Sequence, residues 1–197
     1  MRLKEVERPH SLLQKVRNSF MRTFMGDIPG PILAMSYGRD LGGKHLARCY
    51  QEGLRQAREW SAGELEIFAA FVANLNRCQY CIASHSAITQ YALGSTERVQ
   101  AVLADWRTAP ISSRLRGALQ FLEKLTLKPG EIGCDDADAA RAAGVSDLAL
   151  REAIYVCFLI STMTRLADAL DFALPDPQTL QRGARILARF GYCGMRV

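Results

Sequence analysis

No stretch of this chain alternates apolar and polar residues over the length of a β-strand, and no Asn-Gly or Asp-Gly pair marks a hairpin. Apolar residues instead recur at spacings of three and four, with glycine and proline residues between the segments. The pattern predicts an all-α protein. Because the 197 residues contain no linker long enough to divide them and no repeat, we expect residues 1–197 to form a single domain.

The clearest helix start is at Ser61, because Ser61 and Glu64 have the spacing of a capping box. The helix predicted to follow, over 62–77, is apolar on nearly every side, which is typical of a central, buried helix. The next helix is predicted over 79–93, so that a Cys-x-x-Cys sequence lies at its start. Further helices are predicted over 95–106, 112–127, 135–143 and 146–170, the last of them stopped by Pro175 and Pro177, with two or three more before residue 60.

The formal net charge of +5 comes from the two ends of the chain. Residues 1–25 hold six basic and two acidic side chains, and residues 177–197 hold four basic and no acidic ones. Residues 26–176 are therefore mildly acidic, with a net charge of −3. Basic ends on an acidic body are typical of solvated termini or of helix faces used in self-association, so we expect no nucleic-acid partner.

The first eight residues carry charges where a secretory signal would have an apolar stretch, so we expect a cytoplasmic protein. The longest unbroken apolar run is the eight residues 153–160. This is short of the ~18–20 residues that cross a bilayer, and we expect no membrane partner. In a reducing compartment the six cysteines are not expected to form structural disulfides. Cys49, Cys134 and Cys157 have no partner nearby in sequence, and Cys157 is expected to pack in the core.

Two cysteines and a histidine are expected to share one helix face. Cys78, Cys81 and His85 stand at positions i, i+3 and i+7, so both sulfurs and the imidazole point the same way. The dipole at a helix N-terminus stabilises a thiolate, a nearby imidazole can hold the proton, and a thiol three residues away can close a disulfide. The pattern favours a dithiol redox catalyst.

Two other interpretations stay open for these three residues. They also have the spacing of three ligands of a structural zinc, with Cys193 or a carboxylate as the fourth. Alternatively, the cysteines are small core residues and His85 is a buried polar group with a partner. Structural zinc usually stabilises small, loop-rich modules, whereas this motif lies between strong helices in a chain large enough to fold unaided. This difference favours the redox interpretation.

The chain resembles the carboxymuconolactone decarboxylase/alkylhydroperoxidase D (AhpD-like) superfamily in the residues of its core motif, which are 64–66, the apolar helix after them, 74–81 and His85. Segments 105–110 and 121–126 resemble its branch of uncharacterised peroxidase-related proteins, and the similarity covers about residues 25–175. The resemblance implies an AhpD-like helical bundle that assembles into homo-oligomers, with basic N- and C-terminal extensions outside the family core.

For function, the resemblance implies reduction of a peroxide by a cysteine pair that a glutamate and a histidine serve. The family's cysteines fall on Cys78 and Cys81, its histidine on His85 and its glutamate on Glu66. The alkylhydroperoxidase has a second histidine between its cysteines, where this chain has Tyr80. A phenol with a pKa of about 10 cannot shuttle protons at neutral pH, although it can donate a hydrogen bond. The decarboxylase branch generally lacks the cysteine pair, which argues against lactone decarboxylation.

Whether Glu66 reaches this site depends on a turn between the two helices. Twelve residues of straight helix would place Glu66 ~18 Å from Cys78 and exclude it. If the chain turns near residues 77–79, the helices run antiparallel and Glu66 lies near His85, in an imperfect register that a water or a neighbouring subunit could bridge. From its position alone, Glu66 is equally well a first-turn acid that the helix dipole favours.

The sequence therefore predicts a thiol-dependent peroxidase with a small hydroperoxide as substrate, an external dithiol as reductant, and no cofactor or metal. His85 is the expected general base, assisted by Glu66. The helix dipole favours Cys78 as the attacking thiolate, whereas His85 one turn away favours Cys81, which we prefer. Two other functions stay open: a protein or lipoyl disulfide reductase or adaptor, and a non-catalytic oligomeric or zinc-bound binding module.

Overall fold

The computed structural model describes residues 1–37 and 42–192. Every regular element in this part of the chain is helical, which confirms the predicted all-α class. The α-helices of the described residues are α1 (Leu12–Met25), α2 (Gly30–Tyr37), α3 (Gly43–Arg55), α4 (Ala62–Leu75), α5 (Gln79–Leu93), α6 (Glu97–Asp105), α7 (Ser113–Leu127), α8 (Cys134–Ala142), α9 (Asp147–Leu170) and α10 (Pro177–Phe190).

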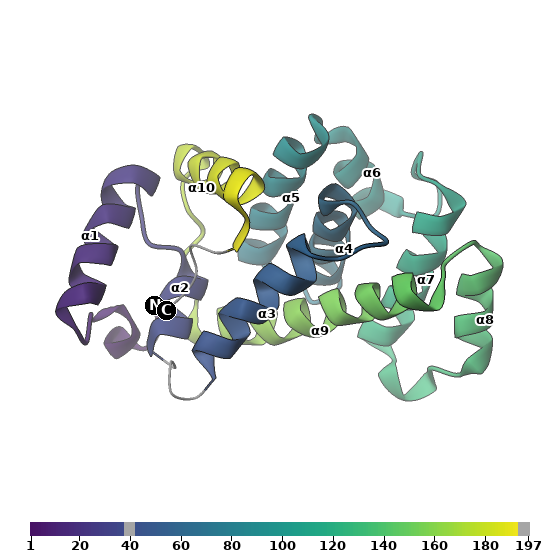
Figure 1. Ribbon diagram of the computed structural model, residues 1–197, viewed down its shortest axis with the longest axis horizontal. Coiled ribbons are helices and arrows are strands. Elements are labelled where there is room, and N and C mark those ends of the chain that lie inside the picture. The colour runs from purple at the N-terminus through teal and green to yellow at the C-terminus, as the bar shows by residue number, and fades with distance from the viewer. Residues whose placement is uncertain (38–41, 193–197) are drawn as a thin grey trace.

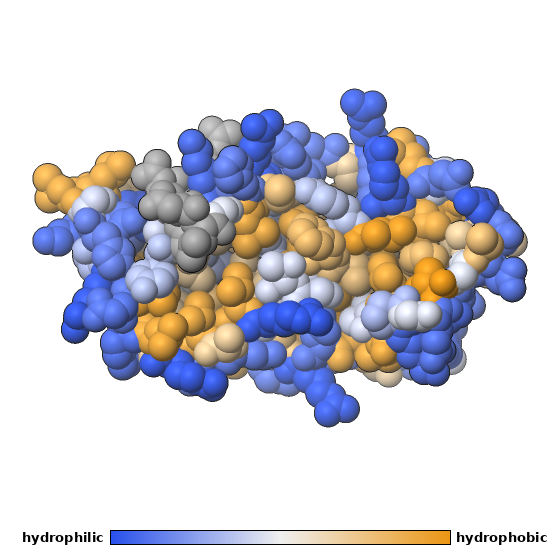
Figure 2. Space-filling view, turned by 90° about the horizontal axis from the view of Figure 1, so that it is seen from below, coloured by the Kyte–Doolittle hydropathy of each residue, from blue (hydrophilic) through white to orange (hydrophobic). Residues whose placement is uncertain are grey.

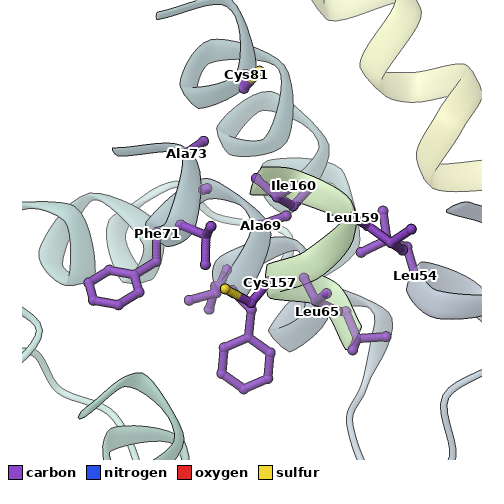
Figure 3. Packing of buried hydrophobic residues seen from close by; sticks show 14 of the residues in the cluster. Leu54, Leu65, Ala69, Phe71, Ala73, Cys81, Cys157, Leu159 and Ile160 are labelled. Atoms are coloured by element: carbon purple, nitrogen blue, oxygen red, sulfur yellow. The ribbon is translucent and has the colours of Figure 1, made fainter. Parts of the chain in front are cut away.

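Helix α4 is the centre of the fold, as predicted, and packs against α5, α7 and α9 (Figure 1). Its start is the expected capping box: Glu64 N–H donates to Ser61 Oγ, and Ser61 N–H donates to the Glu64 carboxylate. Ten of its 14 residues are buried. Figure 3 shows part of this core, with Ala69 of α4 close to Ile160 of α9. The apolar sequence of α4 on every side therefore reflects burial on every side.

Helix α9 is the one helix of the described residues that is long and apolar enough to span a membrane, with 24 residues and an apolar window of 18 residues whose mean hydropathy is 1.4. These criteria concern length and composition only, and the core helix of a globular protein also meets them. Here 44% of the apolar window is buried within the protein, where α9 packs against α3, α4 and α7. Helix α9 runs along the lower side in Figure 1, and its exposed apolar side chains are Ile154, Tyr155 and Phe158. Figure 2, which shows the molecule from below, has apolar side chains over much of this face.

A three-residue turn joins α4 to α5 and reverses the chain. Arg77 adopts a left-handed conformation with φ of 60°, and Cys78 N–H donates to Ala73 O at 3.1 Å, so the end of α4 is closed by the turn itself. The two helices then pack side by side, with Gly63 near the start of α4 against Leu93 at the end of α5. They are therefore antiparallel, which is the arrangement that brings Glu66 toward His85.

Helix α10 is a difference from the sequence analysis, which expects only a basic extension after Pro177. The preceding helix ends at Leu170, as predicted, and Pro177 is the first residue of a new helix, a position where a missing N–H costs nothing. The Asp176 side chain accepts from the N–H groups of Gln178 and Thr179 and caps this start. Because α10 packs against α5, residues 177–190 are part of the packed domain (Figure 1).

Helix α1 is amphipathic in the reverse of the usual sense. Its inward side contributes the buried Asn18 and Met25, whereas its outward side carries large apolar residues. The side chains of this outward face, each at least 58% exposed, are Leu12, Leu13, Val16, Phe20 and Phe24. An apolar helical face of this size is the kind of surface that proteins cover in assemblies.

Candidate active site

Glu66 and His85 form a buried pair across the α4–α5 interface. Glu66 is fully buried, and its Oε2 lies 2.7 Å from Nδ1 of His85. The contact is direct, so neither a water nor a second subunit is needed to join them. An ionised carboxylate only accepts hydrogen bonds, so Nδ1 carries the proton and Nε2 of the neutral ring is left as an acceptor. The two residues that the sequence analysis assigned to proton transfer are therefore brought together.

Two further residues bind the other oxygen of Glu66, and the sequence analysis names neither. Arg55 at the end of α3 places Nη1 2.7 Å from Oε1, and the Tyr192 hydroxyl donates to the same atom at 2.9 Å. The Arg55 guanidinium also lies over the Tyr192 ring, 4.8 Å from its centroid. A buried glutamate needs a cationic partner, but nothing in the spacing of the sequence indicates which cation supplies it.

These contacts keep Glu66 ionised. Burial alone would raise the pKa of this carboxyl group, but the hydrogen bond from His85, together with the charge and hydrogen bond of Arg55, outweighs burial and lowers it. The pKa of Tyr192 is raised well above its ordinary value, first by burial and then by the negative charge of Glu66. Tyr192 is therefore a neutral hydrogen-bond donor to a carboxylate.

The two cysteines of the motif are free thiols with opposite pKa shifts. Cys78 is the N-cap of α5, and its Sγ accepts from Cys81 N–H at 3.4 Å. The side chain of Cys81 and backbone N–H groups lower the pKa of Cys78, whereas interaction with Cys78 and burial raise the pKa of Cys81. The pair therefore loses its first proton more readily from Cys78 than from Cys81.

Cys81 and His85 line a cavity of about 440 Å³ that Cys78 does not reach. Its walls come mainly from α1, α5, α10 and residues 27–32, with Tyr50 of α3 and Met163 of α9, and they are mostly apolar. The aromatic side chains in the walls are Phe20, Phe24, Tyr50, Tyr80, Phe190 and Tyr192. The cavity can therefore hold a small organic molecule against one sulfur of the pair.

Tyr80, between the two cysteines, also lines this cavity. Burial and the charge of Cys81 raise its pKa, and its ring packs edge-on against Phe172 at 5.4 Å between centroids. It therefore stays a phenol at neutral pH. It can donate a hydrogen bond into the cavity, but it cannot replace a histidine in a proton relay.

The other three cysteines that the structure describes lie away from the pair. Cys157 is buried in the core, as predicted, with Thr126 Oγ1 3.5 Å from its sulfur. Cys134 is exposed and Cys49 is half-buried, while Cys193, a candidate zinc ligand in the sequence analysis, lies outside the described residues. Within the described ranges, no three His, Cys, Asp or Glu side chains are grouped as metal ligands would be.

A scan against protein-family models finds no match, and a search of the curated proteins also finds none. Solved structures do match. An uncharacterized peroxidase-related protein from Silicibacter sp. TM1040 has a TM-score of 0.77 at 21% identity, over 90% of this chain and 92% of that one. The alkylhydroperoxidase AhpD core protein from Ralstonia eutropha JMP134, also described as uncharacterized and peroxidase-related, gives 0.74 at 20% identity, over 87% and 88% of the two chains.

The debrominase Bmp8 has a TM-score of 0.69 at 18% identity, over 86% of this chain and 90% of that one. At these identities the likeness concerns the fold. The helices that carry the Cys-x-x-Cys motif, the glutamate and the histidine are thus arranged in a known architecture, and this chain shares the all-helical fold of these solved structures, one of which is described as an AhpD core.

Proposed function

We propose that this protein is a thiol-dependent peroxidase that reduces organic hydroperoxides with its Cys78/Cys81 pair. The observation that carries the proposal is the cavity in which Cys81 lies beside His85, while buried Glu66 holds the far side of the imidazole. A thiol, a positioned base and a cavity for the substrate are the components that such a reaction needs.

The first step is attack by Cys81, because Cys81 and not Cys78 faces the cavity. The unprotonated Nε2 of His85, which lines the same cavity, takes the proton of Cys81 and leaves a thiolate there. This thiolate attacks the distal oxygen of the hydroperoxide, the O–O bond breaks, and the alcohol leaves after taking up a proton. Cys81 is then a sulfenic acid.

The second step is attack by Cys78 on the Cys81 sulfenic acid, which releases water and closes the disulfide. An external dithiol reduces this disulfide by exchange and restores both thiols. The unprotonated Nε2 of His85 takes the thiol proton and returns it to the leaving oxygen, while Glu66 holds the ring through Nδ1. Atoms balance as hydroperoxide and two thiols giving alcohol, water and disulfide.

The cavity favours an organic hydroperoxide over hydrogen peroxide as the substrate. Its volume of about 440 Å³ lies within the range of small-molecule sites, and its walls are mostly apolar and aromatic. An apolar body gains free energy on entering such a space, whereas hydrogen peroxide gains almost none. We therefore expect a kcat/KM for cumene hydroperoxide above that for hydrogen peroxide.

The test is stopped-flow oxidation of the reduced protein by cumene hydroperoxide, tert-butyl hydroperoxide and hydrogen peroxide. Cys81→Ser is expected to abolish the reaction. Cys78→Ser is expected to stop at a sulfenic acid that dimedone traps on Cys81. A slow reaction with every peroxide, together with fast reduction of a lipoyl disulfide, would instead favour the disulfide reductase.

Reductive dehalogenation of a halogenated aromatic is a second candidate. The aromatic cavity walls and the fold shared with a debrominase, one structure of which contains 2,3,4-tribromopyrrole, favour it. In this reaction the ring gains a proton, a thiolate takes the halogen, and the second thiol displaces halide as the disulfide closes. Bromide release from 2,3,4-tribromopyrrole by the reduced protein, without reaction with any hydroperoxide, would establish this candidate instead.

We also propose that the chain forms a homo-oligomer through the outward face of α1. Leu12, Leu13 and Val16 of that face lie outside the cavity lining and are each at least 61% exposed, and their burial against another subunit would release water from them. Leu12 and Leu13 do not line the cavity, so the variant Leu12→Glu/Leu13→Glu tests assembly without altering the site. Light scattering should show an oligomer for the wild type and a smaller species for this variant; a wild-type monomer would contradict the proposal.

A further inference from the structure

We propose that Arg55 and Tyr192 are positioning residues that hold one oxygen of Glu66, so that the Glu66–His85 pair keeps a single negative charge and His85 stays a neutral base. The inference rests on the proposed peroxidase function only for what His85 does. The charge of the pair can be measured without any peroxide.

The two oxygens of Glu66 have separate partners. Oε1 is held by Arg55 at 2.7 Å and by Tyr192 at 2.9 Å, and Oε2 faces Nδ1 of His85 at 2.7 Å. A carboxylate fixed in this way presents one oxygen in one direction. The imidazole that it holds is therefore fixed with Nε2 turned away from Glu66.

Arg55 supplies the charge that balances Glu66. The Glu66 side chain is fully buried and that of Arg55 is 11% exposed, so the attraction between them is only weakly screened. Without this cation, a buried carboxylate would be left uncompensated, and the Glu66–His85 pair would take up a proton to neutralise it. A pair that has already taken up a proton at neutral pH cannot accept another from a thiol.

The C-terminal segment keeps both positioning residues in place. Arg55 donates from Nη2 to Leu187 O of α10 at 3.2 Å. Tyr192 N–H donates to Gln51 Oε1 of α3 at 2.6 Å. The end of α3 and the end of α10 are thus joined around Glu66, and the site depends on residues that follow the predicted family core.

Other titratable groups also surround the pair and the cysteines. They are Tyr50 on α3, Cys78, Tyr80 and Cys81 at the start of α5, Asp168 on α9, and Arg17 and Asp27 at the cavity wall. The cation that contacts Glu66 is Arg55, and the hydroxyl that contacts it is that of Tyr192. Changes at these two positions should therefore alter the charge of the pair more than changes at the surface.

The experiment is a pH titration of ¹⁵N-labelled imidazole by NMR, which is practical because the chain has three histidines. In Arg55→Met, the midpoint for proton uptake by the Glu66–His85 pair should rise by about one pH unit or more, and Arg55→Lys should restore most of the difference. Tyr192→Phe removes a hydrogen bond but no charge, so it should give a smaller rise of about half a unit. The pH profile of the reaction with cumene hydroperoxide should move in the same direction.

The matched controls are Arg48→Met, which removes an exposed arginine of α3 that pairs with Glu52, and Tyr91→Phe on α5. Both should titrate as the wild type does. Circular dichroism distinguishes a variant that fails to fold from a folded variant in which Glu66 is no longer held in place. If Arg55→Met does not fold, the comparison uses Arg55→Lys and Tyr192→Phe. Folded variants at both positions with the wild-type midpoint would overturn the inference. If the midpoint shifts but the protein reacts with no peroxide, the positioning role of Arg55 and Tyr192 stands and the proposed peroxidase function is rejected.

Discussion

The α4–α5 hairpin and the terminal helices α1 and α10 surround the same cavity, but they differ in burial and in the residues that they contribute. The hairpin supplies both cysteines, His85 and Glu66, all of them buried. The terminal helices supply mostly apolar cavity walls, and several of their residues, such as Phe20, Phe24 and Phe190, are more than half exposed.

This difference indicates separate roles for the hairpin and the terminal helices. Reacting groups in a well-packed hairpin keep a fixed geometry, because each is held by neighbours on several sides. The walls from α1 and α10 determine which substrate fits against Cys81. We therefore expect changes in the hairpin to slow the reaction with every peroxide, and changes in the terminal helices to alter the preference among peroxides.

The largest effect should come from Glu66→Gln in the hairpin. It leaves the Arg55 charge buried without an anion and replaces one of the two acceptor oxygens, which face His85 on one side and Arg55 on the other, by an NH2 donor; breaking a buried ion pair costs ~3–5 kcal/mol. Urea denaturation should show a loss of this size, and the rate with cumene hydroperoxide should fall about 100-fold or more. Glu64→Gln is the control, because glutamine also completes a capping box. A Glu66→Gln protein with the wild-type rate would show that the pair plays no part in the reaction.

Gly183→Leu in α10 should separate the two regions by substrate. Gly183 lines the cavity, and a Cβ added there would have Met25 Cε at 3.6 Å as its near neighbour, so the new side chain can extend into the cavity. We expect kcat/KM for cumene hydroperoxide to fall ~10-fold and that for hydrogen peroxide to stay unchanged. Gly130→Leu adds the same side chain where nothing lies within 4 Å. Equal losses with both peroxides would contradict the division of roles.

Acidification should reduce the contribution of Glu66 to stability. Its pKa is lowered in the folded protein from an ordinary value of 4.5, so its contribution is present above about pH 4.5 and is lost as the pH falls through the lowered pKa. The difference in unfolding free energy between wild type and Glu66→Gln should therefore be constant near neutrality and shrink in acid. Urea denaturation between pH 3 and about 7 measures it. A difference that grows in acid would mean that Glu66 is protonated in the folded state.

The smallest effect should come from Arg77→Gly at the turn of the hairpin. Arg77 is exposed, and its left-handed backbone costs roughly 1–2 kcal/mol for a residue with a Cβ. Glycine removes this strain, but part of the benefit is offset because glycine has greater freedom in the unfolded chain. We therefore expect Arg77→Gly to raise the free energy of unfolding by about 0.5–1 kcal/mol. Arg77→Ala keeps the Cβ and should give no gain. Equal melting temperatures for Arg77→Gly and Arg77→Ala would show that the left-handed backbone at residue 77 is not strained.

Much of the hairpin could be predicted because its signals are local. The Ser61 cap, the apolar sequence of α4 and the spacing of Cys78, Cys81 and His85 each depend on residues within a few turns of helix. The contact between Glu66 and His85 was open in the sequence, because it depends on a turn that Arg77 makes in a conformation unusual for arginine.

The rest of the site depends on contacts between distant segments. Tyr192 lies 126 residues from Glu66 in sequence, and no periodicity indicates that they meet. Pro177 is compatible with the end of one helix or the start of another, and the choice depends on the packing of α10 against α5. The outward apolar face of α1 was missed because helical periodicity gives the width of a face and not the direction in which it points.

The most direct test of the account is single-turnover oxidation of the fully reduced protein by cumene hydroperoxide, followed by mass spectrometry of the cysteine peptides. The account predicts one equivalent of alcohol per chain, a disulfide between Cys78 and Cys81, and no reaction in Cys81→Ser. Full oxidation in Cys81→Ser, with the sulfenic acid on Cys78, would contradict the assignment of the cavity-facing sulfur as the one that attacks.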